Sequence, residues 1–200
     1  MHPIYPKDLS ALIAQLKKLP GVGQKTAGRY AFELLKWDAD HLNALADLLS
    51  HLKTRLICCS ECGCLMEDHR CLFCSSQGRK QDLLCIIGTP RDVYSIEQTK
   101  HFLGLYHVLG SLISPLDGQM PSNLNLPHLK RRIQRLNIRE VILALDSTLE
   151  GDATSLFLSD HLRELGIQVS RLALGLPIGS CLDYVDEGTL AQALTGRQKL

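Results

Sequence analysis

The stretch CSECGCLMEDHRCLFC, residues 59–74, decides how the rest of the chain is divided. It holds two Cys-x-x-Cys pairs, Cys59/Cys62 and Cys71/Cys74, with eight residues between the inner members. Each pair aims two thiolates at one point, and two such pairs complete the tetrahedral sulfur set of a structural zinc site. A redox pair or scattered buried thiols is the alternative interpretation. The spacing favours Zn²⁺ held by these four cysteines.

The segment between the two pairs is polar and short, so metal binding is expected to supply its folding free energy. Cys58 and Cys64 flank the quartet without the matching spacing and are left out of the site. Cys85 and Cys181 lie in apolar contexts and are predicted to be small buried hydrophobes.

Composition places the chain among ordinary globular proteins: 200 residues, 45% hydrophobic and 22% charged, enough for one α/β core and a small second unit. The sequence shows no signal-peptide pattern, and it has no apolar run approaching the roughly 18 residues of a membrane span. We therefore expect a cytoplasmic protein with reduced thiols and no membrane partner. The net charge of +1 does not by itself indicate a nucleic-acid partner.

The N-terminal part is predicted to be helical. Apolar residues recur at helical spacing over residues 9–19, and the helix is expected to stop at Leu19-Pro20-Gly21-Val22-Gly23. A second helix is predicted from Gln24. Its apolar side is expected to carry five residues, Ala27, Tyr30, Ala31, Leu34 and Leu35.

Two helices joined by a Gly-x-Gly turn resemble the helix-hairpin-helix DNA-binding motif. Gly21 and Gly23 would let backbone N–H groups at a helix N-terminus approach a phosphate, where the helix dipole also favours an anion. Lys25 and Arg29 are four residues apart and share one helix face. These four residues are the predicted DNA-binding set; an ordinary helical hairpin is the alternative.

A third helix is predicted over residues 40–56, with a leucine stripe along one side. Such a stripe is either internal core or a surface that a partner chain covers. Internal core is the commoner role of such a stripe, but the short N-terminal part can bury only a thin core, so both possibilities are kept. The stripe consists of Leu42, Leu45, Leu48, Leu49, Leu52 and Leu56.

From Leu83 onward, apolar runs alternate with helical segments, which predicts a parallel sheet covered on both faces. The expected strands are 83–87, 106–109, 141–145 and 168–174, and the expected helices lie near 92–99, 129–136 and 153–165. The middle helix carries a basic cluster that is either a solvated face or an anion-binding surface. This cluster consists of Lys130, Arg131, Arg132, Arg135 and Arg139.

The loop after the third predicted strand contains Glu150-Gly151-Asp152, which resembles the acidic element of Toprim domains. Two carboxylates at this spacing either share a divalent cation or cap the following helix. A catalytic Toprim site also needs a glutamate at the end of its first strand, where this chain has Gly88. Bound Mg²⁺ and phosphoryl-transfer chemistry are therefore doubtful.

Taken in order, the motifs resemble the bacterial recombination mediator family RecR over nearly the whole chain. The matching segments are Leu19–Ala27, the four-cysteine spacing, Gly104–Gly110, Ile113–Gly118, Glu150–Thr154, Leu176–Ser180 and Thr189–Leu194. The resemblance implies a multidomain α plus α/β fold. Its parts are a helix-hairpin-helix region at 1–56, a zinc finger at 57–80, a Toprim domain at 81–175 and a C-terminal subunit-contact segment at 176–200.

The resemblance further implies a non-enzymatic, nucleoid-associated DNA clamp that acts with RecO and RecF to help load RecA on single-stranded DNA. Such a clamp binds single- and double-stranded DNA without reading sequence and self-associates as a homotetramer ring built from dimers. A RecO contact carries over to Glu150 and Asp152. The alternative is a metal-dependent Toprim nuclease or topoisomerase-like enzyme.

Overall fold

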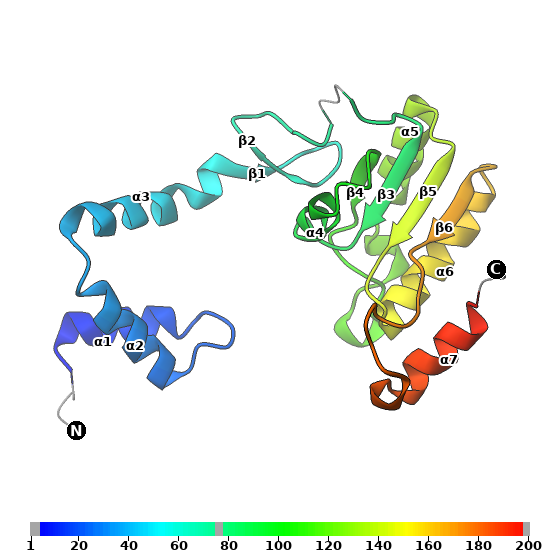
Figure 1. Ribbon diagram of the computed structural model, residues 1–200. Helices are drawn as coiled ribbons and strands as arrows, with labels where there is room; N and C mark the ends of the chain where they lie inside the picture. Colours follow the sequence, from blue (N-terminus) through cyan, green and yellow to red (C-terminus); the bar gives the residue numbers. More distant parts are fainter. Residues whose placement is uncertain (1–4, 75–77, 198–200) are drawn as a thin grey trace. The chain divides into compact units, whose positions relative to one another are not determined.

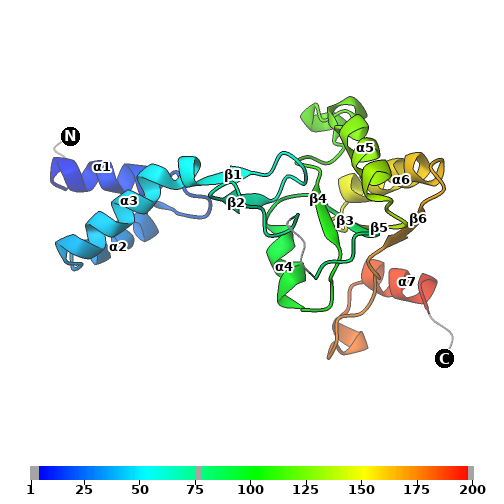
Figure 2. The same ribbon diagram turned by 90° about the horizontal axis from the view of Figure 1, so that it is seen from above.

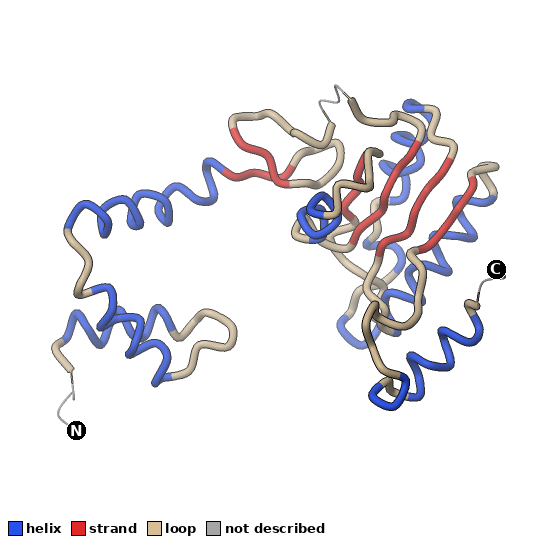
Figure 3. The backbone as a smooth tube through the Cα atoms, viewed as in Figure 1, coloured by secondary structure: helices blue, strands red, loops and turns tan. Residues whose placement is uncertain are grey.

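The computed structural model describes residues 5–74 and 78–197, and the chain divides into two compact units, Met1–Arg55 and Leu56–Leu200. The first unit is helical and the second contains both sheets (Figure 1; Figure 3). The predicted fold class, α-helical in the N-terminal part and α/β in the C-terminal part, is confirmed.

The first unit consists of α1 (Lys7–Leu16), α2 (Gln24–Leu34) and α3 (Ala39–Arg55). Helices α1 and α2 lie side by side and pack against each other (Figure 1; Figure 2). Ile13, Ala27 and Ala31 are buried in the small core of this hairpin. Because so few residues are buried, most of the stability of this hairpin rests on one short contact between two helices.

Two expectations for α1 and α2 were wrong. The α-helical ladder of α1 ends at Leu16, because the N–H groups of Lys18 and Leu19 bond carbonyls three residues back, and Leu19 is exposed. The proline that follows Leu19 disfavours helical backbone before it, which explains the early end. On α2, Tyr30 and Leu35 are exposed rather than part of the apolar side.

The leucine stripe on α3 is largely uncovered. None of the residues of α3 is buried by the described part of the first unit, and only Leu45 of the predicted stripe is half-buried along the helix. Leu48, Leu49 and Leu52 are 59%, 63% and 50% exposed. The stripe is therefore not the internal core of this unit.

The second unit combines a two-stranded antiparallel hairpin with a four-stranded parallel sheet of order β4-β3-β5-β6. The hairpin strands are β1 (Leu56–Cys58) and β2 (Leu65–Glu67), and the sheet strands are β3 (Leu83–Ile87), β4 (Leu105–Val108), β5 (Glu140–Ala144) and β6 (Gln168–Arg171). The helices are α4 (Asp92–Gln98), α5 (Leu126–Leu136), α6 (Leu149–Arg163) and α7 (Glu187–Thr195). Short 3-10 segments lie at Pro115–Asp117, Pro121–Asn123 and Leu182–Tyr184.

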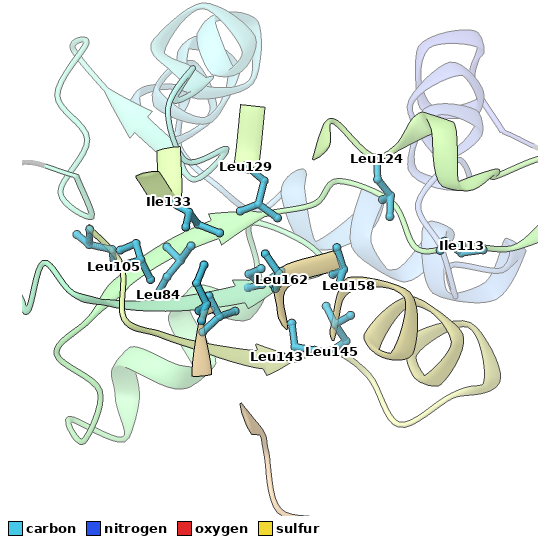
Figure 4. Packing of buried hydrophobic residues seen from close by; sticks show 14 residues of the cluster. Leu84, Leu105, Ile113, Leu124, Leu129, Ile133, Leu143, Leu145, Leu158 and Leu162 are labelled. Atoms are coloured by element: carbon cyan, nitrogen blue, oxygen red, sulfur yellow. The ribbon is translucent and has the colours of Figure 1, made fainter. Parts of the chain in front are cut away.

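Strand alternation divides the second core into two clusters. Leu84 and Ile86 of β3 join the larger cluster with residues of α5 and α6, whose packing against the strands is visible in Figure 4. Cys85 and Ile87 of the same strand point into a second cluster that includes Val93 of α4. The sheet is thus covered on both faces, as the apolar strands predict.

Helix α6 begins four residues earlier than expected. Thr148 is its N-cap, and the Thr148 hydroxyl accepts a hydrogen bond from the Gly151 N–H at 3.1 Å. Glu150 and Asp152 consequently lie inside the first helical turn and not on a preceding loop. Of the two alternatives for these carboxylates, helix capping is correct only in part: both acids lie at the helix N-terminus, but Thr148 and not Asp152 is the N-cap.

Gly151 allows α6 to start directly behind β5. A Cβ atom added there would stand 1.9 Å from the backbone carbonyl oxygen of Asp146, which no small shift relieves. The Glu-Gly-Asp segment therefore needs its glycine for close packing of helix against strand.

Gly151→Ala is expected to lower the free energy of unfolding by about 3 kcal/mol because the new methyl group overpacks the backbone. Thermal unfolding followed by circular dichroism measures this. Gly88→Ala is the control at the same sheet edge: its Cβ would lie 3.6 Å from the Asp92 carboxylate, an ordinary contact. Because this contact is ordinary, the control should lose less than about 1 kcal/mol of unfolding free energy. Equal losses in the two variants would contradict the role given to Gly151.

No helix among the described residues is long and apolar enough to cross a membrane.

Candidate metal centre and nucleic-acid interface

The segment 59–74, called the cysteine loop from here on, is shaped by two tight turns around the hairpin β1–β2. In the first turn the Cys59 N–H donates a hydrogen bond to the Cys64 carbonyl and the Gly63 N–H donates one to the Cys59 carbonyl. Both N–O distances are 2.8 Å. In the second turn the Cys74 N–H bonds the Cys71 carbonyl at 3.3 Å. The hairpin strands bring the two turns to the same place.

The four predicted ligands converge. The sulfur atoms of Cys59, Cys62, Cys71 and Cys74 all lie within 4.8 Å of one another, with Sγ–Sγ distances of 3.9 Å for Cys59 to Cys74 and 3.5 Å for Cys62 to Cys71. A tetrahedral zinc site with bonds of about 2.3 Å has sulfur–sulfur edges of about 3.8 Å. The sulfur set therefore fits a tetrahedrally coordinated metal ion.

The other cysteines and His69 stand apart from this cluster. Cys58 is exposed, and Cys64 is buried beside the quartet without belonging to it. His69 is exposed in the turn that follows β2. Cys85 is buried as expected, whereas the expectation for Cys181 was wrong, because that side chain is exposed at a 3-10 turn.

The cysteine loop covers the free edge of β4. The Val108 N–H donates to the Cys62 carbonyl at 2.7 Å, and the Tyr106 carbonyl accepts from the Arg132 guanidinium. Gly63 has a φ of +77°, and a Cβ there would stand 2.8 Å from that of Val108, so glycine permits the close approach. Edge strands need such cover because their backbone groups are otherwise unpaired.

A polar network joins Arg79, which follows the cysteine loop in sequence, to α4 and β4. Arg79 donates to both carboxylate oxygens of Glu97 at 2.9 and 3.1 Å, and the Tyr106 hydroxyl donates to Glu97 at 2.6 Å. Burial acts to raise the pKa of Glu97, but the hydrogen bonds from Arg79 and Tyr106 lower it below the usual value. The carboxylate therefore stays ionised inside the network.

Sequence reasoning missed one residue of this region, Arg132. It is 3% exposed, and its guanidinium reaches Cys74 Sγ at 3.7 Å. The sequence did carry a signal: Arg132 lies at helical spacing from Leu129, Ile133 and Leu136, so it occupies the apolar face of α5.

In the first unit, the hairpin has the geometry that anion binding needs. Gly21 has a φ of +76°, and Gly23 is the N-cap of α2, with no side chain bonded to the helix end. Lys25 and Arg29 are both exposed. The start of α2 therefore presents backbone N–H groups, with Lys25 in the first turn and Arg29 one turn further on.

These cations belong to a groove on α2. It is lined by Lys25, Arg29 and Lys36 together with two aromatic rings, Tyr5 and Phe32. The two rings meet edge to face with centroids 5.9 Å apart, and Phe32 is 47% exposed. Lys36 is partly neutralised by Glu33, 2.7 Å away. The structure thus groups positive charge with exposed aromatic surface on one helix.

The acidic residues do not assemble into a comparable metal site. Asp152 pairs with Arg171 of β6, and Glu150 is half-buried without an ion pair among the described residues. Within residues 5–74 and 78–197, the four cysteines form the one group of three or more potential ligands whose atoms converge. At the end of β3 the nearest carboxylate to Gly88 is Asp92, which accepts a hydrogen bond from the Thr89 N–H.

Comparison with known proteins agrees with this architecture. The profile for the RecR helix-hairpin-helix matches residues 9–53, that for the Toprim domain matches 82–173, and that for the RecR C-terminal region matches 175–198. The chain is 52% identical over 195 residues to the recombination protein RecR of Protochlamydia amoebophila, covering 98% of each chain. The chain belongs to the RecR family.

Other relatives are similar over the same length. The recombination protein RecR of Chlamydia caviae is 49% identical over 195 residues, and that of Chlamydia trachomatis serovar D is 48% identical, each covering 96% of this chain and 97% of the relative. The predicted membership of the RecR family is thereby confirmed.

Cys59→Ser is expected to abolish metal retention and to lower the free energy of unfolding of the second unit by about 3 kcal/mol or more. Zinc content after gel filtration and thermal unfolding measure the two effects. Cys58→Ser changes the adjacent, exposed cysteine outside the cluster and should leave both quantities unchanged. Equal metal content in the two variants would contradict the assignment of the ligands.

Proposed function

We propose that this RecR-family chain is a non-enzymatic DNA clamp of recombinational repair. The observation that carries the proposal is the glycine-capped start of α2, whose exposed N–H groups lie beside Lys25 and Arg29. Gly21, Gly23, Lys25 and Arg29 would bind DNA phosphates. Because such contacts go to the backbone, single- and double-stranded DNA of any sequence would be accepted.

The metal centre has a structural role in this proposal. Zn²⁺ held by the four cysteines would close the cysteine loop and so keep the edge of β4 covered. A closed set of four thiolates leaves no open coordination position for a substrate, which distinguishes it from a catalytic zinc site.

The exposed face of α3 supports self-association. Its leucines form an apolar stripe that nothing in the described first unit covers, whereas Asp47 on the other side pairs with His51 and Arg55 of the same helix. A second copy of the chain would bury the stripe, and C-terminal residues 176–200 would supply a further subunit contact. A homotetramer ring built from such dimers would retain DNA by encircling it, because linked weak sites raise effective concentration.

The partners proposed for this clamp are RecO and RecF, with which it would help load RecA on single-stranded DNA at the nucleoid in the cytoplasm. Glu150 and Asp152 would contribute to the RecO contact. Of the two, Glu150 is the freer group, because Asp152 is already paired with Arg171. Glu150 is accordingly expected to carry the larger share of a charge-dependent contact.

A metal-dependent Toprim nuclease is the rival function. It needs carboxylates that converge on a divalent cation, as well as a general acid or base at the end of β3. Gly88 occupies that strand end, and Asp152 is engaged by Arg171. We therefore favour the clamp, and DNA incubated with the protein and Mg²⁺ should stay uncut.

Lys25→Ala combined with Arg29→Ala is expected to weaken DNA binding by roughly tenfold or more and to reduce the slope of log affinity against log salt by about 2. Fluorescence anisotropy with labelled single- and double-stranded DNA across a salt series measures both quantities. Lys53→Ala with Arg163→Ala removes the same charge elsewhere and should leave the slope unchanged. A slope that the hairpin pair does not alter would refute phosphate binding there.

Leu48→Glu combined with Leu52→Glu is expected to reduce the mass of the assembly, because each new carboxylate would have to be buried at the α3 contact. Light scattering with and without DNA measures the mass. Asn43→Glu with Ser50→Glu adds the same charge on the opposite face of α3 and should preserve the assembly. If both pairs leave the mass as it is in the unmodified chain, the α3 contact is excluded.

A further inference from the structure

Arg132 is a buried cation without an ordinary counter-ion. It lies on α5 with 3% of its surface exposed, in the helix turn that faces β4. No carboxylate among the described residues comes within ion-pair distance of its guanidinium, although the neighbouring Arg135 pairs with Glu61. Burying a charge in this way is unfavourable unless another group balances it.

The groups that accept hydrogen bonds from Arg132 do not balance its positive charge. One terminal nitrogen donates to the Tyr106 carbonyl at 2.5 Å and lies 3.3 Å from His107 Nδ1, and the inner Nε has no hydrogen-bond partner in the described structure. Burial, with Arg132 and His128 close by, lowers the pKa of His107 to about 3, so that imidazole is neutral at pH 7. These acceptors orient the guanidinium but carry no net charge.

The remaining terminal nitrogen points at the cysteine cluster. It lies 3.7 Å from Cys74 Sγ, one of the four converging sulfurs. Four thiolates around one divalent ion carry a net charge of about −2, so a loaded centre is an anion. The other nearby arginine, Arg79, is already paired with Glu97. Arg132 is therefore the cation in contact with the sulfur set.

We propose that Arg132 is the internal counter-ion of the four-cysteine metal centre and couples metal occupancy to docking of the cysteine loop on β4 and α5. With metal bound, its charge is balanced by the thiolate cluster. Without metal, the same guanidinium is a buried cation that lacks this metal–thiolate cluster as its counter-charge. Arg132 is a positioning residue in this scheme: it binds no metal itself.

The contacts around Arg132 explain how metal occupancy of the cysteine cluster would affect the packing of the sheet edge. Its guanidinium joins Cys74 to the edge carbonyl of Tyr106, while on the same helix His128 Nε2 lies 3.0 Å from the Glu61 carbonyl within the loop. Because α5, the loop and β4 meet at this side chain, a loss of charge balance there would loosen all three contacts together.

The inference rests on the metal site proposed above and is tested with Arg132→Met, Arg132→Lys and the control Arg131→Met in the full-length protein. Arg131 is exposed on the same helix, so the control removes the same charge from solvent. Zinc release to a chromophoric chelator is followed over time. Arg132→Met should release zinc about 10–100-fold faster than the unmodified chain, Arg132→Lys should be intermediate, and Arg131→Met should be unchanged within about twofold.

A spectroscopic measurement separates this role from general destabilisation. In the cobalt-substituted protein, loss of the N–H to sulfur contact should shift the sulfur-to-cobalt charge-transfer band in the Arg132→Lys variant and not in Arg131→Met. The lysine variant keeps the charge and much of the volume, so it provides this readout even if Arg132→Met fails to fold.

The outcomes distinguish the two proposals. If the unmodified chain retains no metal, the metal site itself is wrong. If it retains zinc, but Arg132→Lys and every folded Arg132 variant match Arg131→Met in release rate and cobalt spectrum, the metal site stands and the counter-ion role is overturned.

Discussion

The edge of β4 is the constraint on which the second unit depends. An edge strand presents unpaired N–H and C=O groups, and here both kinds are satisfied from outside the sheet. The Cys62 carbonyl accepts a hydrogen bond from the Val108 N–H, and the Arg132 guanidinium donates one to the Tyr106 carbonyl. The first of these partners belongs to the cysteine loop and the second to α5, so the β4 edge is covered only where the loop and α5 both lie against it.

The same constraint explains why the cysteine loop shares its core with the sheet. Its five cysteines and Phe73 pack in one cluster with Cys85, Ile87 and Tyr106. A loop this short buries too little surface to fold by itself, so the sheet face supplies the apolar partner, and a metal bound by the four converging cysteines would supply the cross-link. The first unit differs, because its buried core is limited to a few residues of α1 and α2 while the leucines of α3 are exposed.

Much of this architecture was predictable from the sequence, because it depends on the types and spacing of neighbouring residues. Strand β3 is a continuous apolar run, and the cysteine spacing alone identified four sulfurs that converge in space. The start of α6 was missed because Thr148 capping depends on backbone geometry rather than on the acidic residues nearby. The buried position of Arg132 was missed because its positive charge suggested a solvent-exposed side chain. Its guanidinium instead contacts Cys74, which lies 58 residues away in the sequence.

For the candidate site, residue type and spacing predicted which side chains come together, but not how much of each is exposed. The exposure of Lys25 and Arg29 follows from packing of α1 against the other side of α2. The half-buried state of Glu150 and the pairing of Asp152 with Arg171 required the tertiary structure, since β6 lies far along the chain. Such long-range pairs have no local sequence pattern.

The cover on β4 has a consequence for the chain in a metal-poor environment. A released cysteine loop would leave the Val108 N–H unpaired on an edge strand whose neighbours in the sheet are strongly apolar. Such an edge is a template for strand addition by another molecule. Metal at the cysteine cluster would then protect against polymerisation, because it keeps the edge of the sheet covered, and starvation for the metal would produce insoluble protein.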